Sequence, residues 1–426
     1  MAEMKDSGIE WCGKIPISWN VMPNKYVMHK KKEICPKYNG EDILSLTMDG
    51  VIVRDLDAGG KMPASFDGYQ RVHPHNLLMC LFDYDVTPRC IGLIQNEGLT
   101  SPAYSQFVMK NGNDARYYYY YYLMIDNTKE LLHLAKNLRH SFTEDQLGII
   151  NTPVPPVEIQ KQIAKYLDQK CEDIDAVYVE IEKQIETLEE YKKSIITEAV
   201  TKGLDPDVEM KDSGISYIGN IPKHWKVTNL KYLGKCQNGI SKGGEYFGNG
   251  FPFVSYGDVY KNYSIPQNVD GLIMSTKTEQ NIYSVKYGDV FFTRTSETIE
   301  EIGFASTCLK SIDNSVFAGF LIRFRPTSSD LIPEFSKFYF RSNIHRKFFV
   351  KEMNLVTRAS LSQNLLGRLP VLLPPLCEQQ MIAINLEKKC AEIDGAIEEK
   401  KEQLEILEQY KKSLIYEYVT GKKEVK

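Results

Sequence analysis

The sequence lacks the short motifs that mark the commonest nucleotide and metal sites. It has no GxxxxGK followed by Ser or Thr, the phosphate-binding loop of many nucleotidases, and none of its seven histidines belongs to an HExxH zinc motif. A DNA methyltransferase also needs an Asn/Asp-Pro-Pro-aromatic tetrad, whereas the two Pro-Pro pairs here follow Val154 and Leu373. Only a catalytic site assembled from residues far apart in the sequence is left open.

Cysteine and long apolar runs are equally scarce. The nine cysteines occur singly, with no CxxC pair and no histidine at zinc-finger spacing, so neither a disulfide framework nor a structural zinc site is indicated. No run of 18 apolar residues occurs, and the first residues, MAEMKDSGIEWCGKIP, lack the apolar core of a signal peptide. We therefore expect a cytoplasmic protein with reduced thiols and no membrane partner.

The net charge of −4 argues at first against a polyanionic partner. The charge is unevenly distributed, however, because residues 157–200 hold 11 acidic and 6 basic side chains and residues 376–420 hold 10 and 6. The rest of the chain is mildly basic. Two interpretations stay open from charge alone: solvated acidic faces beside ordinary domains, or basic domains that meet nucleic acid.

Two stretches of 44 residues, Val157–Val200 and Leu376–Val419, predict long helices. The second repeats the first at a shift of 219 residues, and each helix would be about 66 Å long. We call two positions that coincide at this shift equivalent. Apolar residues in the first stretch recur every three or four positions, at Ile163, Leu167, Cys171, Ile174, Tyr178, Ile181, Ile185, Leu188 and Ile195.

Because such a seam needs a partner of similar length, we predict that the two helices form an antiparallel pair. The alternative is two unrelated surface helices, each packed on its own domain.

The duplication extends beyond the helices. Met4–Ile9 and Trp19 recur 206 residues later as Met210–Ile215 and Trp225, so the chain is two copies of one unit whose globular parts have diverged most. With 426 residues there is room for two or three domains. We predict a globular domain at 1–155, a helix at 156–203, a second globular domain at 204–373 and a second helix at 374–426.

Short β-branched and aromatic runs bounded by Gly, Asn and Asp predict strands, so each globular part is expected to be a mixed α/β domain. Tyr117–Tyr122 and Phe335–Phe340 are interpreted as amphipathic helices capped by Asp or Ser. The six tyrosines could stack on bases, but core packing is the favoured interpretation.

Taken together, these motifs resemble the specificity subunit of type I restriction-modification enzymes over essentially the whole chain. The resemblance is carried by the duplicated MKDSGI entries, the helix starts PVPPVEIQKQIA and LLPPLCEQQMIA, the helix ends LEEYKKSIITEAV and LEQYKKSLIYEYV, and VFFTRTSETIEEIGFAS. The first unit departs from the pattern: Val157–Gln160 replaces the Leu-x-Glu-Gln seen at Leu376–Gln379, and the counterpart of RTSET is degraded around Leu81-Phe82-Asp83.

The resemblance implies an α+β fold with a pseudo-twofold internal repeat, in which two target recognition domains are separated by two long helices forming an antiparallel coiled coil. It implies a non-catalytic subunit that recognises double-stranded DNA with a bipartite site, the helices setting the spacing. It also implies two modification subunits and, for cleavage, restriction subunits, to which S-adenosylmethionine, ATP and magnesium belong. No metal or cofactor site is expected in this chain.

Candidate contact residues follow from side-chain chemistry. Lysine needs only charge to contact phosphate, and arginine can bind guanine through two hydrogen bonds. The DNA-binding candidates are Lys30, Lys31, Lys32, Arg54, Lys61, Arg71, Arg89, Arg139, Lys242, Lys261, Arg294, Thr295, Ser296, Arg358 and Ser360. For each, a surface or ion-paired role is the alternative. The duplicated helix ends give partner-binding candidates at Tyr191, Lys192, Lys193, Tyr410, Lys411 and Lys412.

Two other classes of protein stay open. One is a coiled-coil scaffold that carries two protein-binding domains and never meets DNA, which salt-dependent binding of duplex DNA would separate from a DNA reader. The other is a fused nuclease or methyltransferase, which cofactor binding by the isolated chain would support.

Overall fold

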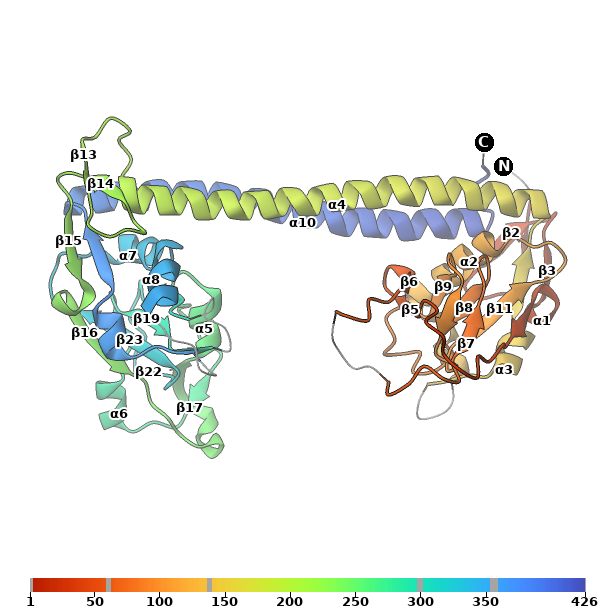
Figure 1. The fold of residues 1–426 in the computed structure, drawn as a ribbon, viewed down its shortest axis with the longest axis horizontal. Coiled ribbons are helices and arrows are strands. Elements are labelled where there is room, and N and C mark those ends of the chain that lie inside the picture. Colours follow the sequence, from red (N-terminus) through yellow and green to blue (C-terminus); the bar gives the residue numbers. More distant parts are fainter. Residues whose placement is uncertain (1–2, 59–62, 136–139, 297–301, 353–358, 426) are drawn as a thin grey trace. The chain divides into compact units, whose positions relative to one another are not determined.

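The computed structural model describes residues 3–58, 63–135, 140–296, 302–352 and 359–425. Its contacts divide the chain into two compact units (Figure 1): unit 1 is Met1–Glu182 with Lys401–Lys426, and unit 2 is Lys183–Lys400. Each unit therefore combines one globular part with the beginning of one long helix and the end of the other.

The long helices are α4 (Val157–Lys202) and α10 (Leu376–Val419), so both begin where the sequence predicted. They run antiparallel, because in unit 1 Lys411 contacts Asp175 at 2.5 Å while in unit 2 Lys192 contacts Asp394 at 2.6 Å. The two lysines hold equivalent positions in the repeat, as do the two aspartates. This reciprocity is what an internal twofold repeat produces, and the predicted antiparallel pair is confirmed.

The predicted apolar seam is buried at five positions and half-buried at four, which are Tyr178, Ile185, Leu188 and Ile195. Ile163, Leu167 and Cys171 are buried, but in the last turns Ile196 is buried and Ile195 only half-buried. The reason is that the end of α4 packs into the core of unit 2 together with Ala199, so its buried face is set by that core as well as by α10.

The globular parts share one sheet topology. Each contains a four-stranded sheet whose neighbouring strands are all antiparallel. In unit 1 the order is β4 (Met28–Lys31), β11 (Ser105–Met109), β8 (Leu77–Met79) and β9 (Ile91–Leu93). In unit 2 the order is β16 (Gly234–Asn238), β23 (Leu321–Pro326), β19 (Val290–Thr293) and β21 (Ala305–Thr307). The α+β class predicted from the sequence is confirmed.

Short strands and helices surround each sheet. Unit 1 adds β1 (Met4–Asp6), β2 (Lys14–Pro16), β3 (Asn20–Pro23), β5 (Leu44–Thr47), β6 (Gly50–Val53), β7 (Gln70–Val72), β10 (Gly98–Thr100), β12 (Asn151–Val154), α1 (Asn24–Val27), α2 (Ala115–Thr128) and α3 (Glu144–Ile149). Unit 2 adds β13 (Met210–Asp212), β14 (Asn220–Pro222), β15 (Lys226–Asn229), β17 (Phe247–Val254), β18 (Leu272–Ile273), β20 (Thr295–Ser296), β22 (Val316–Phe317), β24 (Ala359–Ser360), β25 (Pro370–Leu373), α5 (Tyr256–Lys261), α6 (Lys277–Ile282), α7 (Pro333–Tyr339), α8 (Ile344–Glu352) and α9 (Gln363–Gly367).

The duplicated MKDSGI motif forms the same hairpin in each unit, β1 with β2 and β13 with β14. The C-terminal end of a long helix packs against each hairpin. Gly421 follows α10 at φ +69°, and a Cβ there would lie 2.5 Å from Pro16. Gly203 follows α4 at φ +78°, and a Cβ there would lie 3.9 Å from Pro222 of β14. The hairpin formed by the repeated motif therefore contacts the end of a long helix in each unit.

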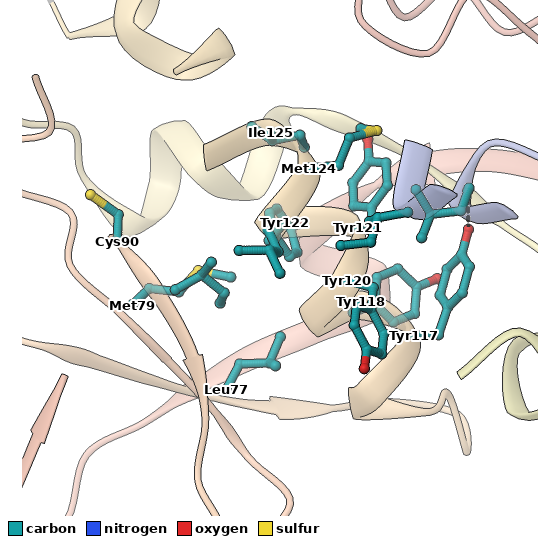
Figure 2. Close-up of a cluster of buried hydrophobic side chains, with 14 of the residues drawn as sticks. Leu77, Met79, Cys90, Tyr117, Tyr118, Tyr120, Tyr121, Tyr122, Met124 and Ile125 are labelled. Atoms are coloured by element: carbon teal, nitrogen blue, oxygen red, sulfur yellow. Dashed lines mark hydrogen bonds between the residues drawn. The ribbon is translucent and has the colours of Figure 1, made fainter. Parts of the chain in front are cut away.

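The tyrosine-rich segment is the core helix α2. Asp114 caps it by accepting a hydrogen bond from the backbone N–H of Arg116 at 2.8 Å, as predicted. Five of the six tyrosines are buried, and Figure 2 shows them within the apolar cluster that also holds Leu77 and Met79 of β8. The Tyr117 hydroxyl donates to the carbonyl of Val419 at 2.8 Å. Core packing, the favoured interpretation, is confirmed.

The corresponding helix of unit 2, α7, differs at its start. The predicted Asp or Ser cap is wrong there: Ile332 is the N-cap, makes no side-chain capping bond, and precedes Pro333. Proline suits this position because its missing N–H would have had no partner in the first turn. The backbone N–H of Ile332 donates instead to Oε1 of Gln379 at 3.0 Å.

A buried glutamine fastens each long helix to its own globular part. Gln160 and Gln379 hold equivalent positions, and both are fully buried. The Gln160 amide oxygen accepts from the backbone N–H of Asp114, the N-cap of α2, at 2.9 Å. The Gln379 amide oxygen accepts from the backbone N–H of Ile332, the N-cap of α7, at 3.0 Å. Each amide nitrogen donates to the carbonyl of the proline that stands two positions before the long helix, at 2.8 and 3.0 Å.

We expect Gln379→Ala to lower the free energy of unfolding of the chain by about 1–3 kcal/mol, because buried N–H and carbonyl groups lose their partners. Urea unfolding monitored by tryptophan fluorescence measures it. The adjacent Gln380 is exposed, so Gln380→Ala is the matched control and should change stability by less than about 0.5 kcal/mol. Equal effects of the two substitutions would contradict a fastening role for Gln379.

Candidate nucleic-acid interface

In unit 2 the structure brings several predicted contact residues together. The short strands β20 and β24 pair antiparallel, with Thr295 opposite Ser360. Arg294 directly precedes β20. Its backbone carbonyl accepts from the N–H of Leu361 at 2.8 Å, which fixes it beside the same strand pair. The adjacent candidates Arg294 and Thr295 are thus brought together with Ser360, which lies far from them in the sequence.

The side chain of Arg294 is accessible and can bind a ligand. Arg294 and Thr295 are half-exposed and Ser360 is exposed. One guanidinium nitrogen of Arg294 lies 3.4 Å from the carbonyl of Gly319, which is long for a hydrogen bond. Among the residues that the structure describes, no carboxylate lies within ion-pair distance of Arg294. A guanidinium held in this way retains donors for a base edge or a phosphate.

Four other candidates have side chains outside the described part of the structure. Lys61, Arg139 and Arg358 lie outside the described residues. Ser296 is described only through its backbone, opposite Ala359 in the β20–β24 pair.

The lysines of unit 2 differ in their surroundings. Lys242 contacts the Glu279 carboxylate at 2.8 Å, donates to the carbonyl of Met274 at 2.8 Å and lies 5.0 Å from the Tyr246 ring centre. The hydrogen bond from Lys242 lowers the pKa of Glu279 to about 2. These contacts give Lys242 a structural role. Lys261 is exposed at the end of α5.

In unit 1 three of the predicted basic residues have carboxylate partners. Arg71 lies 2.8 Å from Glu41, 3.5 Å from Glu97 and 3.8 Å from Glu33. The other two pairs are Lys30 with Glu144 and Lys31 with Glu33, the latter at 3.3 Å. Lys32 is exposed. The three carboxylates offset the positive charge of Arg71, so Arg71 would attract DNA phosphates only weakly.

The remaining unit 1 candidates do not converge as Arg294, Thr295 and Ser360 do. Burial raises the pKa of the Tyr119 hydroxyl on α2, and the nearby Arg89 opposes this rise. Arg54 is half-exposed, and its backbone N–H donates to the carbonyl of Ile43 at 2.7 Å. The structure therefore gathers a candidate site in unit 2 and none of equal definition among the described residues of unit 1.

The backbone arrangement around Arg294 nevertheless exists in both units. In unit 1 the N–H of Phe142 donates to the carbonyl of Leu81 at 2.9 Å, as Leu361 does to Arg294. Phe142 and Leu361 hold equivalent positions in the repeat, so Leu81 stands in the place of Arg294. Leu81 is buried. The two units thus present different side chains from one scaffold.

The duplicated helix ends also divide into two kinds of residue. Lys192 and Lys411 form the ion pairs between α4 and α10. Lys193 pairs with Glu190 at 2.7 Å and Lys412 with Glu408 at 2.6 Å, each within its own helix. The two tyrosines, Tyr191 and Tyr410, are each 53% exposed and accessible to a partner.

Among the described residues, no group of three or more His, Cys, Asp or Glu side chains is placed to hold a metal ion. None of the described helices is long and apolar enough to cross a membrane.

Sequence reasoning missed one exposed residue beside the site. Phe320 lies in the turn before β23, and its carbonyl accepts from the N–H of Arg294 at 2.9 Å. Its side chain is 65% exposed. No sequence signal marks it, because a single phenylalanine next to a strand is ordinary and Arg294 stands well before it in the chain. Gln160 and Gln379 were detectable in principle, since they coincide when the two copies of the repeat are aligned.

Fold and site together define an internally duplicated α+β protein, with two like domains built on one antiparallel helix pair and different side chains at corresponding positions. The family model "Type I restriction modification DNA specificity domain" matches residues 93–189 and 222–415. The chain belongs to this family.

Individual relatives agree with this placement. The chain is 31% identical over 295 residues to the type I restriction enzyme MjaVIII specificity subunit of Methanocaldococcus jannaschii, covering 65% of this chain and 63% of that one. It is 27% identical over 254 residues to the EcoKI specificity subunit of Escherichia coli K12, covering 58% and 52%. The matches thus span less than two thirds of these relatives.

Solved structures show the same fold. A chain from a study of complex assembly and conformational transition of the type I restriction-modification system superposes with a TM-score of 0.70 at 13% identity, covering 95% of this chain and 98% of that one. The HsdS subunit from Thermoanaerobacter tengcongensis gives 0.51 at 14% identity, covering 96% and 98%.

Proposed function

We propose that this chain is the DNA-reading subunit of a type I restriction-modification system and carries no catalytic centre of its own. The observation that carries the proposal is the convergence of Arg294, Thr295 and Ser360 on one surface of a family-matched domain. Arginine beside hydroxyl side chains is a combination that reads base edges, because arginine donates twice to guanine and the hydroxyls donate or accept. The protein acts in the cytoplasm, where the DNA is.

The site that we propose is bipartite. The target recognition domains are residues 1–155 and 204–373, each reading one half, and the helices 156–203 and 374–426 set the spacing between the halves. Support comes from the shared topology with unlike side chains, Arg294 in unit 2 and Leu81 in unit 1. Two different readers on one scaffold would recognise two different short sequences.

Lysines and arginines would divide the work in this proposal. Lys32 and Lys261 are exposed and suit phosphate contacts, which need charge alone. Arg294 suits a base edge. We propose a structural role, and no direct DNA contact, for the candidates that already pair with carboxylates, which are Lys30, Lys31, Arg71 and Lys242.

The partners that we propose are two modification subunits, with restriction subunits in systems that cleave. S-adenosylmethionine, ATP and magnesium would be bound by those subunits. Tyr191 and Tyr410 support the stoichiometry, because they present equally exposed rings at equivalent positions of the repeat. Two copies of one partner fit such a pair.

The test is selection of bound duplexes from a random DNA library by the full chain with its modification subunits, at several salt concentrations. We expect enriched sequences with two specified segments and an unspecified gap, and affinity that falls as salt rises. Binding that is absent at every salt concentration would favour the scaffold. Cofactor binding by the isolated chain would favour the fused enzyme.

A further inference from the structure

Phe320 is an exposed aromatic residue at the edge of the proposed reading surface. It lies between β22 and β23, and 65% of its surface is accessible to solvent. Single exposed apolar side chains are common and need no explanation by themselves. Phe320 differs because of how rigidly its backbone is held and because of its neighbour.

The turn that carries Phe320 is fixed by close backbone packing. A Cβ on Gly319 would lie 2.2 Å from the Ser241 hydroxyl oxygen, and one on Gly239 would lie 2.1 Å from the carbonyl oxygen of Ala318. A side chain at Gly239 would clash with backbone atoms, and one at Gly319 would displace the Ser241 side chain. The N–H of Ile240 also donates to the carbonyl of Phe317 at 2.9 Å. The ring of Phe320 therefore projects from a backbone with little freedom to move, which reduces the entropy lost on binding.

The same turn is joined to Arg294. The backbone N–H of Arg294 donates to the Phe320 carbonyl at 2.9 Å, and its guanidinium meets the Gly319 carbonyl at 3.4 Å. An apolar ring and a guanidinium thus project from one junction. We call the surface formed by Arg294, Thr295, Phe320 and Ser360 the Arg294 patch.

We propose that Phe320 contacts the 5-methyl group of a thymine in the half-site read by unit 2, beside the base pair read by Arg294. The proposal rests on the proposed function. A phenyl ring cannot hydrogen-bond to a base edge, and the thymine methyl is the one apolar group that the major groove presents to an apolar side chain. The rival role for an exposed ring, insertion between base steps, would depend on unstacking and not on the methyl.

Unit 1 lacks this feature and provides an internal comparison. Ser105 and Ile322 hold corresponding positions in the two sheets, opposite Met79 and Phe292. Two positions earlier along the chain stand Ala103 in unit 1 and Phe320 in unit 2. The half-site read by unit 1 should therefore contain no thymine whose methyl is read from this position.

The experiment replaces each thymine of the selected site by deoxyuridine, one at a time, and measures duplex affinity for the full chain with its modification subunits. For the natural protein we expect one replacement in the second half-site to weaken binding about fourfold, the value of burying one methyl group at about 0.8 kcal/mol. Phe320→Ala should weaken binding to the thymine duplex and make it insensitive to that replacement. Phe320→Leu should keep part of the sensitivity.

Two further variants make each outcome decisive. Tyr232→Ala removes a ring that is 69% exposed elsewhere in unit 2, in the short 3-10 helix Leu230–Tyr232, and should leave affinity unchanged. If Arg294→Ala weakens specific binding while no deoxyuridine position matters, the thymine contact is overturned and the proposed function stands. If Phe320→Ala weakens binding equally with thymine and deoxyuridine, the ring inserts or packs instead. If Arg294→Ala is also without effect, the Arg294 patch itself is not the reading surface.

Discussion

Removing seven residues from each long helix, 180–186 from α4 and 399–405 from α10, is expected to shorten the gap between the two half-sites by about three base pairs. Seven residues of helix span about 10.5 Å, and one base pair rises about 3.4 Å. One heptad is removed so that the apolar seam keeps its register. The two deleted segments are equivalent in the repeat, which preserves the reciprocal pairs Asp175–Lys411 and Lys192–Asp394.

The measurement is sequencing of methylated sites in a host that expresses the shortened chain with its modification subunits. Both half-sites should be unchanged in sequence, because neither globular part is altered. Deleting the heptad from α4 alone is the control, and it should abolish function because the two helices no longer match in length. An unchanged gap in a shortened chain that still folds would show that the helices do not set the spacing.

Arg294→Ala is expected to weaken specific DNA binding by about 1–3 kcal/mol while nonspecific binding stays almost the same. The reason is that two hydrogen bonds to a guanine edge exist only on the cognate sequence, whereas the phosphate contacts of other residues persist on any duplex. Competition of cognate against scrambled duplexes measures both affinities at one salt concentration. Specificity should relax at a single base pair of the second half-site.

A matched control is available in the same unit. Arg368 is an arginine whose side chain is 60% exposed, it lies at the end of α9, and its nearest carboxylate is Glu352 at 3.6 Å. Arg368→Ala should leave the ratio of specific to nonspecific binding unchanged. If Arg294→Ala weakens both kinds of binding equally, Arg294 contacts phosphate and another residue reads the base.

The helices and the duplication could be predicted because their signals are local or repeated. A seam of apolar residues every three or four positions defines a helix without reference to the rest of the chain, and the internal repeat identified its partner. The prediction missed Ile196, which is buried while Ile195 is half-buried, since the core of unit 2 determines that turn. It was also wrong at the start of α7, where Pro333 at the first position replaces a polar cap.

The site could be predicted only in part, for a different physical reason. Arg294 and Thr295 lie in the motif VFFTRTSETIEEIGFAS that carries the resemblance, and the structure brings them beside Ser360. Whether another basic residue forms an ion pair depends on carboxylates that are distant in the sequence. Lys242, for example, pairs with Glu279, which is 37 positions away. Such pairing leaves no trace in sequence spacing. Phe320 was missed for the same reason, since only the turn geometry places it beside Arg294.

The central claim is that this chain decides which DNA is modified by reading two separate short sequences. Mapping methylated adenines across the genome of a host that carries the modification subunits, with and without this chain, tests it most directly. The account predicts that two unlike specified segments at one fixed gap appear as a methylated motif only when the chain is present. A methylation pattern that is the same in its absence, or a motif without a gap, would contradict it.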